Sequence, residues 1–164
     1  MARQQAQPEL LLKGARVILR DKRREDARQD YLWRTDPELA RLDASYPLTT
    51  SFEDFQSYYT EEIRYPPPRS YRFAIETIQG CYIGNCMYYD LNSRKGETEL
   101  GILIGNRDYW GQGYGSEAVA LLVDHIFANL GLKRIYLETL DWNIRAQRSF
   151  NKCGFLTYSR SGKT

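Results

Sequence analysis

The pattern of apolar and polar positions along the chain predicts short strands that alternate with longer helices. Residues 98–104 are rich in leucine and isoleucine, which is typical of a strand buried on both faces. Apolar residues at helical spacing follow over residues 116–130, and Gly131 ends this predicted helix. Residues 134–140 form the next predicted strand. Because a helix connects the two strands, we expect them to be parallel.

The other predicted elements surround this strand–helix–strand unit. Strands over residues 72–78 and 81–91 are joined by a short turn, so we expect them to pair in antiparallel fashion. A helix over residues 51–64 opens at a capping box made by Ser51 and Asp54. The remaining predicted elements are a first strand over residues 16–20, helical segments over residues 26–34 and from Asp36, a last helix over residues 143–152 and a last strand over residues 155–159.

The fold class follows from this order of elements. We predict an α+β (α/β) fold with a mixed, mostly antiparallel central sheet flanked by helices, and a βαβ core. The 164 residues suit one domain, and no repeat, linker or low-complexity block divides them. Residues 1–9 are polar and rich in glutamine, so we expect a frayed tail there.

The end of the predicted sheet looks incomplete. Only residues 160–164 follow the last predicted strand, which would leave the strand at 134–140 with an unpaired edge. The last strand could shift across, or a second copy in a homodimer could supply a strand. We favour a third expectation, that the natural chain continues past Thr164 and that a C-terminal strand is missing here.

Composition narrows the possible partners and the compartment. A net charge of +2 is too small to indicate nucleic-acid binding, and no apolar run reaches membrane length. Cys81, Cys86 and Cys153 show no metal-ligand spacing, and their odd number argues against a disulfide framework. We therefore expect free thiols, no metal, and a cytoplasmic protein.

A glycine-spaced loop lies between the buried strand and the long helix. Glycines at alternate positions let backbone N–H groups converge on an anion, and the positive end of the following helix dipole points to the same place. The geometry suits a diphosphate, whereas the dinucleotide fingerprint would require a glycine at Ser116. The predicted cradle comprises Trp110, Gly111, Gln112, Gly113, Tyr114, Gly115 and Ser116.

This loop resembles the Arg/Gln-x-x-Gly-x-Gly/Ala loop of the GNAT N-acetyltransferases. Residues 143–155 are similar to their Asn-x-x-Ala-x-x-x-Tyr-x-x-x-Gly-Phe helix, and the resemblance covers about residues 14–160. The amino-acid sequence of residues 109–118 is most similar to that of the family branch that acetylates N-terminal alanine or serine of ribosomal proteins. The resemblance implies acetyl-CoA (coenzyme A) as the cofactor, with further contacts from Leu103, Ile104, Asn143 and Phe150.

The chain departs from the family pattern at two positions. Many members carry at position 150 a tyrosine that protonates the departing thiolate, and Phe150 has no proton to give. Trp110 replaces the arginine or glutamine at the head of the loop. Because the cradle works mainly through backbone N–H groups, we expect cofactor binding to survive. Asn143 precedes a helix, so it can cap that helix as well as contact the pantetheine arm.

Glu99 is the candidate general base. It lies in the buried strand on the same side as Gly101 and Leu103, and its apolar neighbours keep water from the carboxylate, which favours proton uptake. The resemblance also places a glutamate here. A structural carboxylate is the alternative interpretation, and Glu138 in the next strand is the reserve base.

The leading hypothesis is acetyl transfer from acetyl-CoA to a primary amine by direct attack, and the branch resemblance suggests the N-terminal amine of a ribosomal protein. One alternative acceptor is a polyamine or an aminoglycoside. Another alternative is a non-catalytic CoA-binding regulatory module, because Phe150 lacks the hydroxyl. The resemblance places the acceptor wall in a helical insertion that carries four tyrosines and five acidic residues: Tyr46, Tyr58, Tyr59, Tyr65, Asp36, Glu38, Asp43, Glu53 and Asp54.

Overall fold

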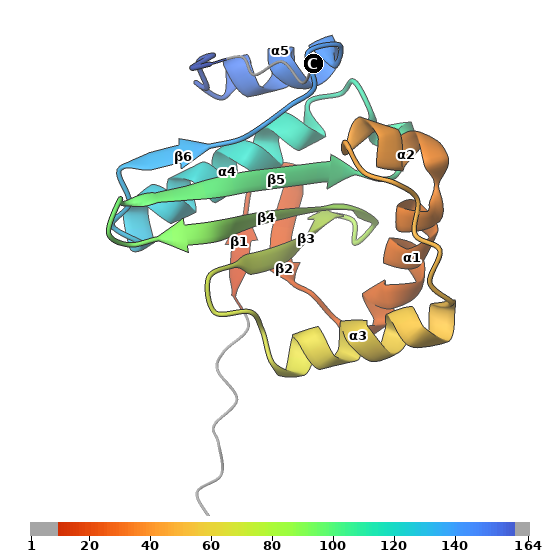
Figure 1. Ribbon diagram of the computed structural model, residues 1–164. Helices are drawn as coiled ribbons and strands as arrows, with labels where there is room; N and C mark the ends of the chain where they lie inside the picture. The colour runs from red at the N-terminus through yellow and green to blue at the C-terminus, as the bar shows by residue number, and fades with distance from the viewer. Residues whose placement is uncertain (1–9, 160–164) are drawn as a thin grey trace, which may run out of the picture.

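The computed structural model describes residues 10–159, so the tail predicted over residues 1–9 lies outside the described part of the chain (Figure 1). Six strands form one sheet in the order β1-β2-β3-β4-β5-β6. Neighbouring strands are antiparallel except for β5 and β6, which are parallel. The predicted mixed, mostly antiparallel sheet is therefore confirmed.

The elements keep the predicted order, and among the strands and α-helices of the described residues the sequence pattern missed the short β1. The strands are β1 (Leu11–Lys13), β2 (Val17–Asp21), β3 (Tyr71–Thr77), β4 (Tyr82–Asn92), β5 (Glu97–Ile104) and β6 (Arg134–Tyr136). The helices are α1 (Ala27–Thr35), α2 (Pro37–Leu42), α3 (Phe52–Arg64), α4 (Tyr114–Asn129) and α5 (Ile144–Lys152), with short 3-10 turns at Arg24–Asp26 and Arg107–Tyr109. Within residues 10–159, no helix has the length and apolar character needed to cross a membrane.

Two strand predictions were wrong near the C-terminal end. The strand expected over residues 134–140 ends at Tyr136, and residues 155–159 form no strand. Leu156 and Tyr158 alternate as in a strand, but their side chains are 88% and 84% exposed. A strand needs a partner for its main-chain groups. Within the described residues β6 is the edge strand and pairs only with β5.

One face of the sheet, which we call the α4 face, is apolar. Val17, Leu19, Phe73 and Ile75 point to this face from β2 and β3 and are fully buried. The predicted apolar stripe of α4 packs against them, with Val119, Leu122 and Ile126 at 0% exposure. Burial of each such side chain stabilises the fold by about 1.5–3 kcal/mol. This packing fixes α4, and with it the position of the glycine loop.

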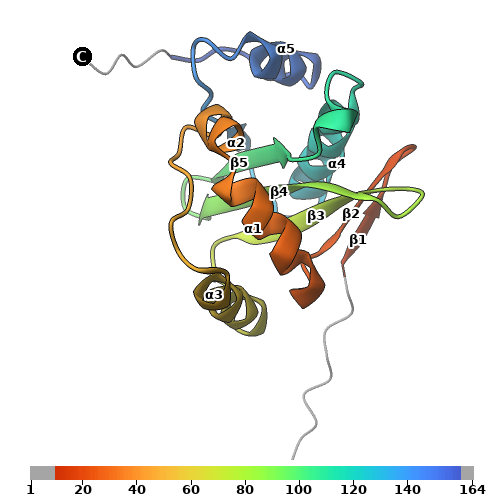
Figure 2. The ribbon, with the colours of Figure 1, turned by 90° about the vertical axis from the view of Figure 1, so that its right-hand side faces the viewer.

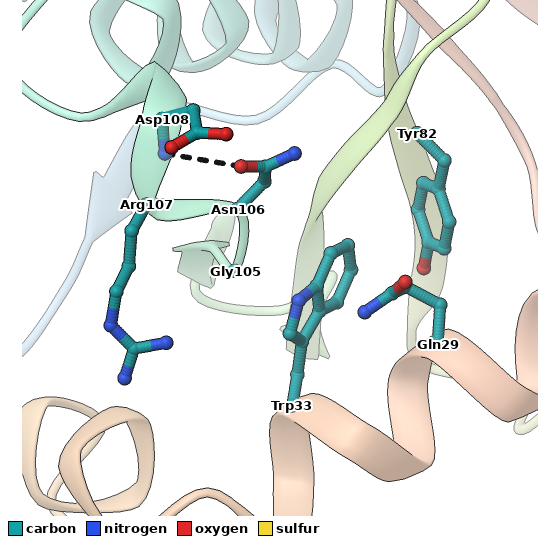
Figure 3. Close-up of a pocket in the computed structure, with 7 residues that line it drawn as sticks. All are labelled: Gln29, Trp33, Tyr82, Gly105, Asn106, Arg107 and Asp108. Atoms are coloured by element: carbon teal, nitrogen blue, oxygen red, sulfur yellow. Dashed lines mark hydrogen bonds between the residues drawn. The ribbon is translucent and has the colours of Figure 1, made fainter.

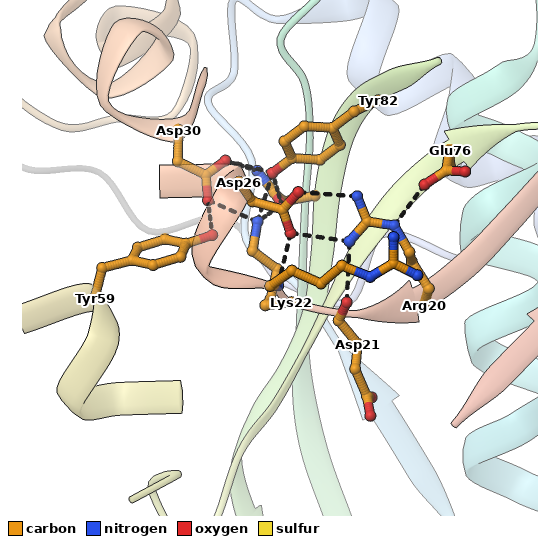
Figure 4. A network of polar contacts seen from close by, with 10 residues as sticks. Arg20, Asp21, Lys22, Asp26, Asp30, Tyr59, Glu76 and Tyr82 are labelled. Carbon is orange, nitrogen blue, oxygen red and sulfur yellow. Dashed lines mark hydrogen bonds and ion pairs between the residues drawn. The ribbon is translucent and has the colours of Figure 1, made fainter. Parts of the chain in front are cut away.

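The opposite face, which we call the polar face, carries a buried network of charges (Figure 4). Both terminal nitrogens of Arg20 donate to the Asp26 carboxylate at 2.9 Å, and its Nε donates to Glu76. Lys22 Nζ and the Tyr59 hydroxyl donate to Asp30 Oδ2, each at 2.6 Å. The network thus attaches α1 and α3 to the sheet. In Figure 1, α1, α2 and α3 lie along the right and lower sides, whereas α5 lies at the top; Figure 2 gives the same arrangement turned by 90°.

The protonation state of Asp26 links this network to pH. Burial alone would raise the pKa of Asp26. Hydrogen bonds from the Arg20 guanidinium and from the Arg23 backbone N–H outweigh burial and hold this pKa below its usual range. The carboxylate therefore stabilises the folded state above about pH 4, and this contribution is lost as the pH falls further, through the folded-state pKa.

We expect Asp26→Asn to lower the free energy of unfolding by about 3 kcal/mol at pH 7, because the variant leaves a buried guanidinium partly unpaired. Denaturant melts measure this difference, which should shrink below about pH 4. The control is Glu62→Gln, which removes an ion pair between Glu62 and Arg72 whose side chains are 46% and 43% exposed. Its effect should stay below about 1 kcal/mol. Equal losses from the two variants would contradict the stabilising role of the network.

Candidate active site

The parallel strands β5 and β6 diverge after three paired positions. Their register joins Glu97 to Arg134, Thr98 to Ile135 and Glu99 to Tyr136, where β6 ends. The next five residues of β5, 100–104, pair with β4 on one side and with no strand of the described chain on the other. The Ile104 carbonyl accepts a hydrogen bond from the Trp110 indole, and the other main-chain groups at this open edge need water or a ligand as a partner. An extended ligand that carries amide groups suits such an edge.

The glycine loop lies beyond the end of β5 and leads into α4. Gly113 is the N-cap of α4, with a left-handed φ of +84° and no side chain that caps the helix. Gly111 also has a left-handed φ, +70°, and a Cβ built there would meet no atom within 4 Å. The first-turn N–H groups of α4 therefore have no side-chain cap, and the loop beside them is open. These residues fit a diphosphate.

Arg16 contacts this loop from the N-terminal end of β2. Its Nη1 donates to the Gln112 carbonyl at 2.9 Å, and its guanidinium lies 4.4 Å from the centre of the Tyr114 ring. A salt bridge of 3.3 Å to Glu117 holds it there. The sequence prediction missed Arg16, because it lies 96 residues before Gln112 and belongs to no motif. It supports the loop and adds positive charge beside it.

Trp110 connects the loop to both β5 and α5. Its indole Nε1 donates to the Ile104 carbonyl at 2.7 Å, and the Arg145 guanidinium lies 4.1 Å from its ring centre. Trp110 and Asn143 line one cavity of about 370 Å³. The structure thus brings the two predicted motifs together. Asn143 Oδ1 accepts a bond from the Ala146 N–H at 3.2 Å, so its capping role is confirmed.

The remaining predicted cofactor contacts lie around this cavity and the loop. Ser116 shares a hydrogen bond of 2.7 Å with Ser149, which ties α4 to α5. The Phe150 ring packs at 6.0 Å from Phe155 and against the core of the α4 face. Leu103 lies opposite Asn85 in β4 and is half-buried. Their contacts to a cofactor stay predictions.

Glu99 is the last residue of β5 that pairs with β6, and the open edge begins after it. Its residue is 9% exposed, and the register places Tyr89 of β4 and Tyr136 of β6 directly opposite it on either side. Burial and then the interaction with the Glu99 carboxylate raise the pKa of Tyr89. Burial and then the Glu99 charge also raise the pKa of Tyr136. The sequence prediction missed both tyrosines, because only the strand register brings them to Glu99.

The structure corrects several expectations about the acceptor side. Glu138 is exposed and lies past the end of β6, so it is not in the middle of a strand. Asp36 is not free to attract a cation, because it caps α2 and pairs with Arg107 at 2.9 Å. Of the four predicted tyrosines only Tyr59 is buried. The other three are 94%, 69% and 67% exposed and form no wall: Tyr46, Tyr58 and Tyr65.

A second cavity of about 280 Å³ lies at the same C-terminal end of β5, on the side of α1 (Figure 3). Figure 3 shows the Trp33 indole rising from α1 beside Gly105. A Cβ built on Gly105 would lie 2.2 Å from that ring, so the two residues interlock. Gly105 follows Glu99 by six residues, a separation of about 20 Å along a strand. We therefore do not assign this cavity to the chemistry at Glu99.

Comparison with known proteins identifies the family. The acetyltransferase (GNAT) domain matches residues 16–156, so the chain belongs to the GNAT acetyltransferases. The crystal structure of spermidine N-acetyltransferase from Vibrio cholerae in complex with CoA and spermine has the same fold. It aligns with a TM-score of 0.80 and 23% identity over 89% of this chain and 84% of that one.

Relatives in sequence add two named proteins. An uncharacterized N-acetyltransferase p20 from Bacillus licheniformis is 34% identical over 44% of this chain and 40% of its own length. Spermidine N(1)-acetyltransferase from Vibrio cholerae is 27% identical over 65% of this chain and 60% of its own length. The chain therefore spans less than two thirds of each of these relatives.

We expect Gly113→Ala to weaken the binding of coenzyme A at least tenfold. The new Cβ would lie 3.1 Å from Arg16 Nη2, and a non-glycine residue is strained at this φ. Isothermal titration calorimetry measures the dissociation constant. Gly131→Ala is the matched control, because Gly131 also has a left-handed φ, +63°, but lies beyond the far end of α4, where its Cβ would meet no atom within 4 Å. If both variants bind coenzyme A alike, the cradle is wrongly assigned.

Proposed function

We propose that the protein transfers the acetyl group of acetyl-CoA to a primary amine of a polyamine. The observation that carries the proposal is the buried carboxylate of Glu99, which lies where the edge of β5 opens. When bound, acetyl-CoA supplies a thioester whose carbonyl carbon an amine can attack. A base beside this edge is what the attacking amine requires, because only a neutral nitrogen has a free electron pair.

Different residues of the chain have different roles in the proposed transfer. The N–H groups of the glycine loop and the start of α4 hold the diphosphate, with the charge of Arg16 close by. The open main-chain edge of β5 over residues 100–104 offers partners to the amides of the pantetheine arm. Glu99 takes the proton that the amine loses. The transfer is direct, because Cys153, the cysteine nearest the motifs, donates its thiol to the Ser116 carbonyl and serves packing.

Charge and relatedness favour a polyamine over the N-terminus of a ribosomal protein. Asp90 and Glu138 act on Tyr136 together with Glu99, so carboxylates near this point attract a polycation, whereas Glu97 is paired with Arg134 at 3.7 Å. The name of the Vibrio cholerae relative specifies spermidine as the acceptor of that protein. The hypothesis of an N-terminal amine as the acceptor rests only on the amino-acid sequence of residues 109–118. A purely regulatory role does not account for a buried glutamate at the open edge.

The proposal predicts the order of acceptors in a thiol-release assay. Spermidine and spermine should give a specificity constant at least tenfold above those of an alanine-initiated peptide, a lysine peptide and an aminoglycoside. Rates should rise with pH, since an alkyl amine with a reference pKa of about 10.4 must lose its proton before it attacks. Preference for the peptide would restore the ribosomal hypothesis. Coenzyme A binding without turnover of any amine would support the regulatory module.

We expect Glu99→Gln to lower kcat by about 10²–10⁴-fold, because the amide cannot accept the proton of the amine. Affinity for coenzyme A should stay within threefold, since the carboxylate acts on the acceptor and not on the cofactor. Glu138→Gln is the comparison variant, and its loss should be less than tenfold. If Glu138→Gln causes the larger loss, the base is Glu138 and our assignment is wrong.

A further inference from the structure

The proposed transfer leaves one proton unassigned. A departing thiol with a pKa of about 8.5 leaves as a thiolate, and a proton donor beside it would speed this step. Phe150 stands where many family members have a tyrosine, and its ring has no proton to give. Its neighbour Ser149 is already hydrogen-bonded to Ser116 at 2.7 Å. A donor for the sulfur must therefore come from another element.

Tyr89 of β4 has the required placement. The register sets it opposite Glu99, and its ring leans along β5 beyond this pair: a Cβ built on Gly101 would lie 3.5 Å from Tyr89 Cε1. Gly101 belongs to the stretch of β5 whose other edge is open. The ring of Tyr89 therefore extends from the base to the part of β5 where we place the pantetheine arm.

A backbone irregularity contributes to this placement. The pairing of β4 with β5 shifts register between Tyr89 and Asn92, and Asp90 has a left-handed φ of +51°. Such bulges turn a strand locally and re-aim the side chains beside them. A non-glycine residue in this conformation is uncommon and marks a constrained site. The bulge follows Tyr89 immediately.

We propose that Tyr89 donates the proton that the departing thiolate takes up, in a relay with Glu99, in place of the tyrosine that is absent at position 150. This inference rests on the proposed acetyl transfer. The nitrogen–carbon bond forms as the carbon–sulfur bond breaks, and Glu99 takes the proton of the amine. The hydroxyl proton of Tyr89 passes to the sulfur, and the proton held by Glu99 restores the phenol. The products are the amide and the free thiol, and the protein returns to its starting state.

Tyr136 faces the same carboxylate but is the weaker candidate. It lies opposite Glu99, whereas the ring of Tyr89 also reaches the position of Gly101 farther along β5. Tyr136 is the last residue of β6, and its guanidinium neighbour Arg134 lies 5.9 Å from its ring centre. Tyr136 therefore provides a matched comparison, because its replacement by phenylalanine removes one hydroxyl beside the same base.

A double-mutant cycle tests the relay with spermidine as the acceptor. Tyr89→Phe should lower kcat by about 10²-fold, whereas Tyr136→Phe should lower it less than threefold. Introducing Phe150→Tyr should then raise kcat at least tenfold more in the Tyr89→Phe background than in the parent, because the two hydroxyls supply the same proton. A structural role for Tyr89 would not produce this rescue. An equal effect of Phe150→Tyr in both backgrounds overturns the inference.

A second readout does not depend on turnover. The pKa of Tyr89 is raised by burial, then by the neighbouring Glu99 carboxylate, and then by the charges of Asp90 and Glu138. Glu99→Gln should therefore lower the pH at which the Tyr89 ¹³Cζ resonance titrates, with the resonance assigned by its loss in Tyr89→Phe. An unchanged titration would show that the two side chains do not interact, and would also overturn the relay.

The two proposals fail in different ways. If the parent turns over no amine, the proposed function is wrong, whatever the resonance of Tyr89 does. If the parent is active on spermidine and Tyr89→Phe retains its kcat, the function stands and the relay is wrong. Calorimetry with coenzyme A and thermal melts accompany each variant, so that a loss of binding or folding is recognised as such; a loss of kcat explained by either also counts against the relay.

Discussion

The open edge of β5 is the constraint on which the rest of the structure depends. A strand inside a sheet normally satisfies its main-chain groups on both sides, and β5 does so only up to Glu99. Residues 100–104 keep their place despite this open edge because they pair with β4 and because Leu100, Ile102 and Ile104 pack into the core of the α4 face. The glycine loop and α5 are then placed at the border of the same edge, held by the indole of Trp110.

The two faces of the sheet make separate contributions to the site. The α4 face is apolar and closely packed, and it fixes the helix at whose N-terminus we propose the diphosphate site. The polar face gathers ionised and hydroxyl groups, from the network of Arg20 and Lys22 to the tyrosines beside Glu99. Burial makes charge–charge interactions on that face stronger than in water. Cofactor binding and acceptor chemistry can therefore be altered independently, although they meet along one strand.

The apolar pattern predicted most of the fold, because α4 shows a helical repeat of apolar positions and β5 is a continuous run rich in leucine and isoleucine. The glycine loop was recognisable because its proposed function requires a backbone conformation that glycine permits, and the glycines at alternate positions are visible in the sequence. Periodicity failed at residues 155–159, where alternation was present but no partner strand was. It also could not find Arg16 or Tyr89. Their roles depend on which strands are neighbours and in what register, and no local pattern encodes a register between segments so far apart.

The interlock of Gly105 with Trp33 has a consequence for mutational scanning. Any side chain at position 105 would collide with the indole, so a deep library should retain only glycine there. Gly105 lies shortly before the glycine loop, where we propose the cofactor site, so such intolerance would invite a functional explanation. Its cause is steric and lies on α1. Gly111, which does border the proposed diphosphate site, has open space around it. A mutational scan that measures only protein abundance would therefore rank Gly105, which matters for packing, as more important than Gly111, which borders the proposed diphosphate site.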